Sequence, residues 1–299
     1  MQASRDAARN LRRGAMYMVG SSLLFAGMGV AVKYAAAALS NETIVFFRSA
    51  AGLVAILPLA LHRGLPALRT EHLGLHAVRG LAGLAAMYCF FFAIAHLPLA
   101  EAVLFNYATP LFVPFIAFVW LRERFAARLW VFIGVGFVGI ALILKPTPAT
   151  FNPVSLIGLS AGLFAAFAMV TIRRLTRTEP SFRIVFYFGV VATVVSAVPL
   201  AWAWRTPPTT LWAVLMAMGV LGTGAQLLLT RAYALAPAAM VGPFTYTTVV
   251  FAALFGAVLW QEQLDIMAVL GIGLVCAGGV LVLRYAPLPR PIAAALTSE

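Results

Sequence analysis

Long apolar runs separated by short breaks are the feature that most constrains this chain. Of its 299 residues, 63% are hydrophobic and only 10% are charged, whereas a typical soluble domain is about 25% charged. A water-soluble fold of this size cannot bury so much apolar surface. Runs of about 20 apolar residues match the thickness of a bilayer, so we predict an all-α integral membrane protein.

Residues that break or begin helices divide the apolar runs into ten predicted transmembrane helices. Residues 40–42 (Ser-Asn-Glu) and Asn152-Pro153 are typical helix starts, the second with proline in the first turn. Short tails remain at 1–13 and 286–299. The predicted helices span 14–38, 42–61, 73–95, 99–120, 126–144, 153–173, 182–203, 210–234, 238–260 and 266–285.

Positive charge is concentrated on one side of the predicted membrane. The formal net charge is +12. With the N-terminus in the cytoplasm, the cytoplasmic segments receive fifteen arginines, and the opposite segments receive only Lys145 and Arg205. Cytoplasmic loops of membrane proteins carry such an excess. We therefore predict that both tails are cytoplasmic, and we interpret the basic charge as contact with anionic lipid rather than with nucleic acid.

The second half of the chain repeats the first at an offset of 139 residues. Each half holds five predicted helices, and because five is odd, the second half enters the membrane from the opposite side. We predict two inverted five-helix repeats, 14–145 and 146–285. Two such halves can exchange conformations, so that a central site faces each side in turn. The matching pairs include Pro98/Pro237, Phe105/Phe244, Tyr107/Tyr246, Thr109/Thr248, Glu123/Glu262, Gly134/Gly273, Gly139/Gly278, Gly80/Gly219 and Gly83/Gly222, and near the second helix the offset slips by one, pairing 44–46 with 184–186.

An ordered set of short motifs resembles the signature region of the EamA-type drug/metabolite transporter superfamily. The motifs are residues 98–101 (Pro-Leu-Ala-Glu), Pro110, 121–124 (Leu-Arg-Glu-Arg), Gly134 and Gly139, with a weaker copy at 237–239, 261–263, Gly273 and Gly278. Within the superfamily the chain resembles the bacterial aromatic amino acid exporters. The resemblance implies export of small metabolites across a bacterial inner membrane by alternating access. The sequence has no glycine-rich phosphate loop, which excludes direct ATP drive from this chain.

Prolines inside the predicted helices mark kinks. Pro110 leaves the carbonyl of Asn106 without its helical donor, Pro114 does the same to the carbonyl of Pro110, and Pro243 frees that of Ala239. A freed carbonyl is costly in lipid, so it should face protein or a water-filled cavity. We expect Pro110 and Asn106 to face a cavity; a simple packing kink is the alternative.

Polar side chains within the apolar runs are the candidate lining of that cavity. Thr223 and Gln226 lie on one face of the predicted helix 210–234, and an amide near the membrane midplane needs partners. Tyr107 and Tyr246, as repeat mates, are expected to close opposite ends of the cavity, with structural packing as the alternative. The complete predicted lining is Tyr88, Asn106, Tyr107, Thr109, Thr223, Gln226, Thr245 and Tyr246.

Four charged residues, Lys33, Glu42, Arg48 and Glu101, lie toward the outer helix ends. They either pair as an outer gate or extend independently to water. No Asp or Glu falls at a helix midpoint, which argues against a conventional proton antiporter. We also expect no cationic side chain deep in the cavity. The predicted substrates are therefore aromatic or other hydrophobic amino acids, or lipophilic drugs whose cationic members bind aromatic faces.

Other functional classes have less support in the sequence. His72 and His76 have the i,i+4 spacing of a metal-binding pair, but only Glu71 accompanies them, so we predict no metal, no cofactor and no enzyme activity. A membrane-embedded enzyme or a scaffold remains the alternative class. The prediction is a transporter whose partners are a small molecule and the lipid bilayer, with no nucleic acid or nucleotide.

Overall fold

The computed structural model describes residues 2–96, 104–123, 126–145, 153–204, 206–261 and 265–285, and every regular element in these ranges is helical. Among these described residues, eight helices are long and apolar enough to cross a membrane, and two apolar helices are shorter. The all-helical membrane fold is confirmed, whereas the count of ten spans stays a prediction. In chain order the elements are α1 (Gln2–Ala36), α2 (Asn41–His62), η1 (Leu65–Leu68), α3 (Leu73–His96), α5 (Thr109–Leu121), α6 (Arg128–Leu144), α7 (Pro153–Leu175), α8 (Ser181–Ala197), α9 (Leu200–Ala203), η3 (Thr209–Leu211), α10 (Trp212–Leu235), α11 (Ala238–Val241), η4 (Gly242–Tyr246), α12 (Thr247–Trp260) and α13 (Ile266–Tyr285).

The ends of several helices follow the sequence signals. Ser40 caps α2, because its side-chain oxygen accepts a hydrogen bond from the backbone N–H of Thr43 at 3.4 Å. Helix α7 begins at Pro153, as predicted. Helix α1 begins at Gln2 instead of residue 14, since alanine and arginine are strong helix formers and the tail continues the helix. The predicted helix 182–203 is divided before Pro199 into α8 and α9.

A helix begins after a break at equivalent places in the two halves, since α5 starts at Thr109 and α12 at Thr247, within one residue of the repeat offset, but the prolines beside these breaks do not correspond to each other. Helix α5 begins at Thr109, next to Pro110, and in the second half the 3-10 segment η4 contains Pro243. The carbonyl freed by Pro110, that of Asn106, accepts a hydrogen bond from the Thr109 hydroxyl at 2.6 Å. Thr109 is buried against α7, where its hydroxyl also lies 3.2 Å from the carbonyl oxygen of Gly162. The freed carbonyl therefore faces protein, which is the packing alternative.

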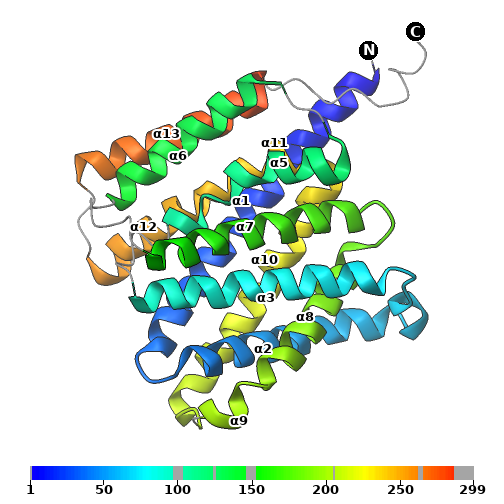
Figure 1. The fold of residues 1–299 in the computed structure, drawn as a ribbon, viewed down its shortest axis with the longest axis vertical. Helices are drawn as coiled ribbons and strands as arrows, with labels where there is room; N and C mark the ends of the chain where they lie inside the picture. The colour runs from blue at the N-terminus through cyan, green and yellow to red at the C-terminus, as the bar shows by residue number, and fades with distance from the viewer. Residues whose placement is uncertain are drawn as a thin grey trace.

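The helices pack in pairs that the repeat relates to one another. Helices α6 and α13 lie side by side along one edge of the molecule, and α2 and α8 pack together at the opposite edge (Figure 1). Between these edges α1 packs along α10, and α3 packs along α7. The 139-residue offset relates α1 to α7 and α3 to α10, so the α1–α10 contact has its equivalent in the α7–α3 contact.

Close contacts between α6 and α13 occur in equivalent pairs. A Cβ atom at Gly139 would lie 2.6 Å from the carbonyl oxygen of Gly271, and one at Gly278 would lie 3.0 Å from that of Phe132. Gly139 corresponds to Gly278, and Phe132 to Gly271, at the same offset. Reciprocal contacts of this kind arise when two similar helices pack in opposite directions. Small residues let the backbones approach this closely in the absence of a hydrophobic driving force.

Backbone geometry also repeats. Arg122 directly follows the end of α5, and Gln261 directly follows the end of α12. Both residues adopt the left-handed conformation, with φ of 55° and 56°. Non-glycine residues seldom adopt this conformation. Two such residues at the repeat offset indicate that the halves share turn geometry as well as helix order.

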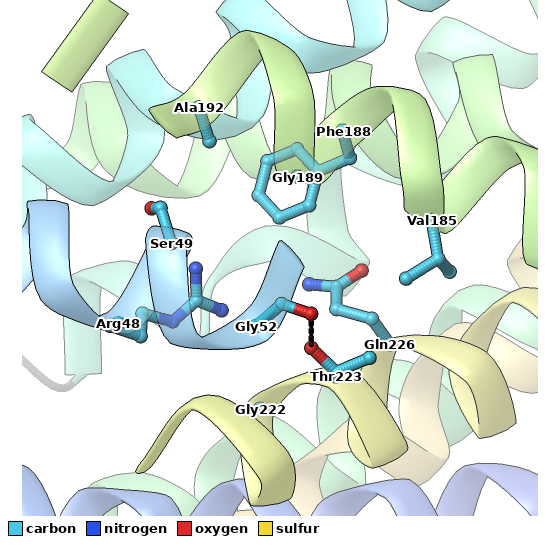
Figure 2. A pocket seen from close by; sticks show the side chains of 10 residues that line it. All are labelled: Arg48, Ser49, Gly52, Val185, Phe188, Gly189, Ala192, Gly222, Thr223 and Gln226. Carbon is cyan, nitrogen blue, oxygen red and sulfur yellow. Dashed lines mark hydrogen bonds between the residues drawn. The ribbon is translucent and has the colours of Figure 1, made fainter. Parts of the chain in front are cut away.

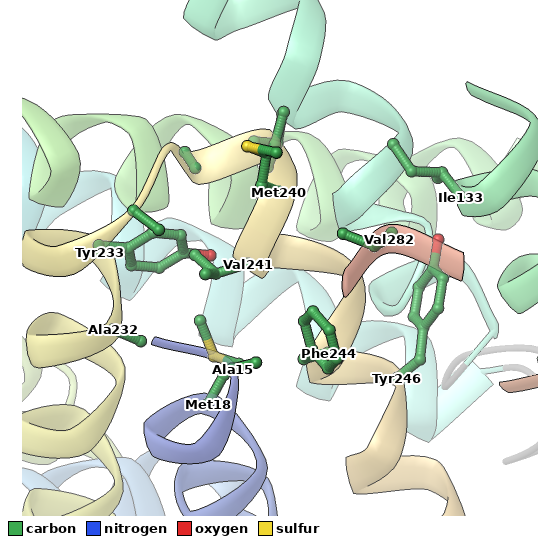
Figure 3. Packing of buried hydrophobic residues seen from close by; sticks show 14 of the residues in the cluster. Ala15, Met18, Ile133, Ala232, Tyr233, Met240, Val241, Phe244, Tyr246 and Val282 are labelled. Carbon is green, nitrogen blue, oxygen red and sulfur yellow. The ribbon is translucent and has the colours of Figure 1, made fainter. Parts of the chain in front are cut away.

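The largest buried cluster lies where α1, α10, α11 and η4 meet α6 and α13 (Figure 3). Met18, Tyr233 and Tyr246 are its largest fully buried side chains that the figure labels. The Tyr246 ring lies against α6, where a Cβ atom at Gly136 would come within 2.7 Å of it. This cluster joins the first helix to the second half of the chain.

Asp265 is expected to contribute stability that depends on pH. Its carboxylate accepts hydrogen bonds from Lys145, at the end of α6, and from the backbone N–H of Ala268 in the first turn of α13. Lys145 is the larger cause that holds the Asp265 pKa below its ordinary value of 3.8. A lowered carboxyl pKa stabilises the fold above that ordinary value, and the stabilisation is lost as the pH falls through the folded-state pKa.

The substitution Asp265→Asn keeps a cap on α13 but removes the charge. We expect it to lower the melting temperature at pH 7 and to have progressively less effect below about pH 4. Melting curves at both pH values test this. A difference from the unsubstituted protein that does not change with pH would contradict it.

Candidate functional site

A small cavity lies between α2, α8 and α10, next to the contact of α2 with its repeat mate α8 (Figure 2). Its volume is about 20 Å³, which is enough for a single water molecule but not for a metabolite. A substrate can enter only if the helices separate. The lining residues are Arg48, Ser49 and Gly52 of α2, Val185, Phe188, Gly189 and Ala192 of α8, and Gly222, Thr223 and Gln226 of α10.

Glycine brings α2 and α10 together beside the cavity. A Cβ atom at Gly219 would lie 2.4 Å from the Cβ of Ala51, and one at Gly52 would lie 2.8 Å from the hydroxyl of Thr223. That hydroxyl donates to the carbonyl of Gly52 at 3.0 Å. The side of α10 that carries Gly219 and Thr223 therefore faces α2, and the Thr223 hydrogen bond joins the two helix backbones.

Two arginines occupy this region, and the expectation of no deep cationic side chain was wrong. Arg79 of α3 is 3% exposed, and its Nη2 donates to Oε1 of Gln226 at 2.7 Å. The guanidinium carbon of Arg79 lies 3.7 Å from the centre of the Phe188 ring. Arg48, expected at an outer gate, is 8% exposed and lines the cavity. Arg79 was a recognisable signal in the sequence, because an ionisable residue inside an apolar run is usually functional.

Of the predicted lining residues, the structure brings only Thr223 and Gln226 into the cavity. Tyr246 is fully buried in the hydrophobic cluster, and Tyr107 packs against that cluster. The buried Tyr88 hydroxyl has no hydrogen-bond partner among the described residues. Two of the others satisfy backbone carbonyls at the helix breaks: Thr109 donates to the carbonyl of Asn106, and Thr245 donates to the carbonyl of Gly242 at 2.8 Å. Asn106 does not line the cavity. Pro110, Pro114 and Pro243 are all buried.

The four charges expected at the outer gate are dispersed where the structure describes them. The Lys33 ammonium lies 3.8 Å from the centre of the Trp260 ring. Glu42 is half-buried in the first turn of α2, and no ion pair joins it to Arg48 among the described residues. Glu101 lies outside the described residues. A gate formed by these residues stays a prediction.

Comparison with known proteins assigns the chain. Residues 12–145 and 152–284 each match the EamA-like transporter family. The chain belongs to the EamA family. The two matches fall on the two halves that the 139-residue offset relates, so the repeat is a pair of EamA domains.

The EamA relatives move chemically different metabolites. The chain is 36% identical over 91% of its length to the pseudopaline exporter CntI of Pseudomonas aeruginosa, covering 94% of that protein. It is 27% identical over 87% of its length to an S-adenosylmethionine uptake transporter of Rickettsia bellii, and 28% identical over 78% to a riboflavin transporter of Vibrio cholerae, covering 89% and 80% of those proteins. A solved crystal structure superposes with a TM-score of 0.79 at 19% identity, covering 91% of this chain and 97% of that one. That likeness shows a shared fold.

This chain also has a second, wider hollow, which lies beside the turn between α7 and α8. It has a volume of about 540 Å³ and is lined by Arg69, Thr70, Glu71, His72, Thr178, Glu179 and Arg183. The buried carboxylate of Glu179 accepts from the Thr70 hydroxyl at 2.6 Å and from Arg183 Nη1 at 2.5 Å. His76 is buried, with its Nε2 4.0 Å from Glu179 and its ring stacked on Tyr187. Glu179 thus links the segment before α3 to the start of α8.

Proposed function

We propose that this EamA protein is a secondary transporter that exports a small metabolite by alternating access, with the cavity between α2, α8 and α10 as its substrate site. The observation that carries the proposal is the position of the cavity. It lies next to the contact of α2 with its repeat mate α8, and it holds Arg48 and Gln226 within an apolar bundle. A site between repeat halves can be opened toward either side by rocking one half against the other.

We further propose that the two EamA domains have inverted topology in a bacterial inner membrane. The reciprocal α6–α13 contacts and the paired left-handed residues Arg122 and Gln261 support this arrangement. Four arginines gather where α7 ends and α8 begins: Arg173 and Arg174 in the last turn of α7, Arg177 in the connecting turn and Arg183 in the first turn of α8. Under the positive-inside rule that end is cytoplasmic, which places the Glu179 hollow and both termini on the cytoplasmic side.

For the substrate we propose an amino acid or similar metabolite with an apolar, preferably aromatic, body. The Phe188 ring, Val185 and Ala192 supply an apolar wall, and Gln226 supplies a polar contact (Figure 2). Two buried arginines disfavour the alternative of lipophilic cations, because like charges repel in a low-dielectric site. The relatives include both exporters and uptake transporters. A single alternating-access mechanism accommodates both, because the gradients of the transported molecules set the direction of net transport.

Counterflow in proteoliposomes tests the proposal. Vesicles loaded with an unlabelled amino acid should accumulate the labelled one transiently, without ATP. A panel of aromatic, aliphatic and polar amino acids, with riboflavin as a larger metabolite, defines the substrate. Absence of counterflow for the whole panel, with protein of verified fold and insertion, would overturn the transport proposal for these substrates.

Gln226→Ala is expected to reduce the counterflow rate roughly 10- to 100-fold, since the amide contacts Arg79 and faces the cavity. Because the substitution also removes the hydrogen-bond acceptor of the buried Arg79, the melting temperature should fall as well, so the rates are compared per amount of folded and inserted protein. Arg231→Gln is the matched control: it lies on the same helix and is exposed. Equal rates for the two variants would remove Gln226 from the site.

A further inference from the structure

Arg48 and Arg79 are buried without an anionic partner. Arg48 is 8% exposed and Arg79 is 3% exposed. Neither arginine takes part in an ion pair among the described residues. Nε and Nη1 of Arg79 have no hydrogen-bond partner among the described residues. A buried charge without a counterion is strongly unfavourable, so this pair requires a compensating group that the described part of the chain does not supply.

The contacts that the arginines do make are with neutral groups. Both guanidinium carbons lie near the Phe188 ring, at 3.7 Å from its centre for Arg79 and 5.9 Å for Arg48. The two guanidinium carbons can be no farther apart than the sum of these two distances. At such a separation inside the protein the two positive charges repel each other. Nε of Arg48 lies 3.4 Å from the sulfur of Met28, and a thioether is a weak acceptor.

Arg79 also determines the direction of the Gln226 amide. Arginine has donors only, so the group that faces it must be the amide oxygen, as the 2.7 Å hydrogen bond shows. The amide nitrogen is then directed into the cavity. Figure 2 shows the Arg48 guanidinium and the Gln226 amide both extending toward the space beneath the Phe188 ring. The cavity thus presents positive charge and N–H donors beside an aromatic face.

We propose that Arg48 and Gln226, with the charge of Arg79 behind them, bind the carboxylate of the transported metabolite. The inference rests on the proposed transport function and specifies its substrate class. A planar carboxylate presents two oxygens that suit guanidinium and amide donors, and its apolar body packs on Phe188 and the wall of α8. The bound anion would be the counterion that Arg48 and Arg79 lack among the residues that the structure describes.

Matched acid and amide pairs test the assignment with purified protein. Benzoate and benzamide, 3-phenylpropionate and 3-phenylpropanamide, and succinate and succinamide differ only in charge and donor pattern. We expect the acids to raise the melting temperature of the protein and to compete with the counterflow substrate, and the amides to do neither. An equal response to acid and amide in all three pairs overturns the proposal, and so does stabilisation by phenyl phosphate alone.

Gln226→Glu provides the sharper variant, because it places a carboxylate of the protein itself against Arg79. We expect this protein to melt at a higher temperature without ligand and to bind the acids at least about tenfold more weakly. Arg231→Gln should behave as the unsubstituted protein. A Gln226→Glu protein that melts lower and still distinguishes acid from amide contradicts the assignment. Selective acid binding without counterflow would overturn transport alone, and equal counterflow of acid and amide would overturn the carboxylate site alone.

Discussion

Gly139→Ala is expected to destabilise the protein by about 3 kcal/mol, the upper range for overpacking. The added Cβ would lie 2.6 Å from the carbonyl oxygen of Gly271 and 2.9 Å from the backbone nitrogen of Val275. Both neighbours are backbone atoms, so a rotamer change cannot relieve the conflict. Helices α6 and α13 would have to move apart along their whole contact.

The control for this prediction lies on the same helix. A Cβ atom at Gly134 meets nothing within 4 Å, so Gly134→Ala should be neutral or stabilising by up to about 1 kcal/mol, the difference in helix propensity. Unfolding of the purified variants in detergent, followed by helical signal, measures both. Similar losses for the two variants would show that the α6–α13 contact is more tolerant than its geometry indicates.

Glu179→Gln is expected to cost about 3 kcal/mol, because it breaks a buried ion pair and leaves a charge behind. The Glu179 and Arg183 side chains are only 3% and 17% exposed. Glutamine keeps the shape and one acceptor for Thr70 but cannot neutralise Arg183. The segment before α3 and the start of α8 would therefore separate more easily.

Glu71→Gln is the matched control, since Glu71 lines the same hollow and is exposed. Its stability should change by less than about 0.5 kcal/mol. Denaturation curves and protease sensitivity of residues 63–72 provide the readouts. Equal stability of the two variants would mean that the Glu179 cluster is not a structural link.

Much of the fold could be predicted from the sequence because apolar length, capping residues and prolines act locally. Ser40 and Pro153 begin their helices where the pattern placed them, and the breaks near Pro110 and Pro243 follow from missing donors. The sequence analysis predicted kinks at these prolines. It did not predict that the helix is interrupted there, because a proline kink and a 3-10 turn have the same sequence signal. The extension of α1 back to Gln2 was not predicted, because the arginine-rich residues before position 14 were interpreted as a separate tail.

The site was predictable only in part, because a position on one helical face does not say which helix it meets. Thr223 and Gln226, singled out because they are polar within an apolar run, do line the small cavity, and their role in binding a substrate stays a prediction. Tyr107 and Tyr246 are equally polar in sequence, yet their rings pack in the hydrophobic cluster. The pairing of Arg79 with Gln226 depends on the α3–α10 geometry, which only the folded chain reveals.

One pair of equivalent positions shows what the fusion of two domains permits. Arg48 on α2 and Phe188 on α8 occupy corresponding sites, with the local slip of one residue, and they face the same cavity. A dimer of identical subunits would have to place two arginines or two phenylalanines there. A single polypeptide can place a cation on one wall of the cavity and an aromatic ring on the other, so the two walls can contact chemically different parts of one ligand.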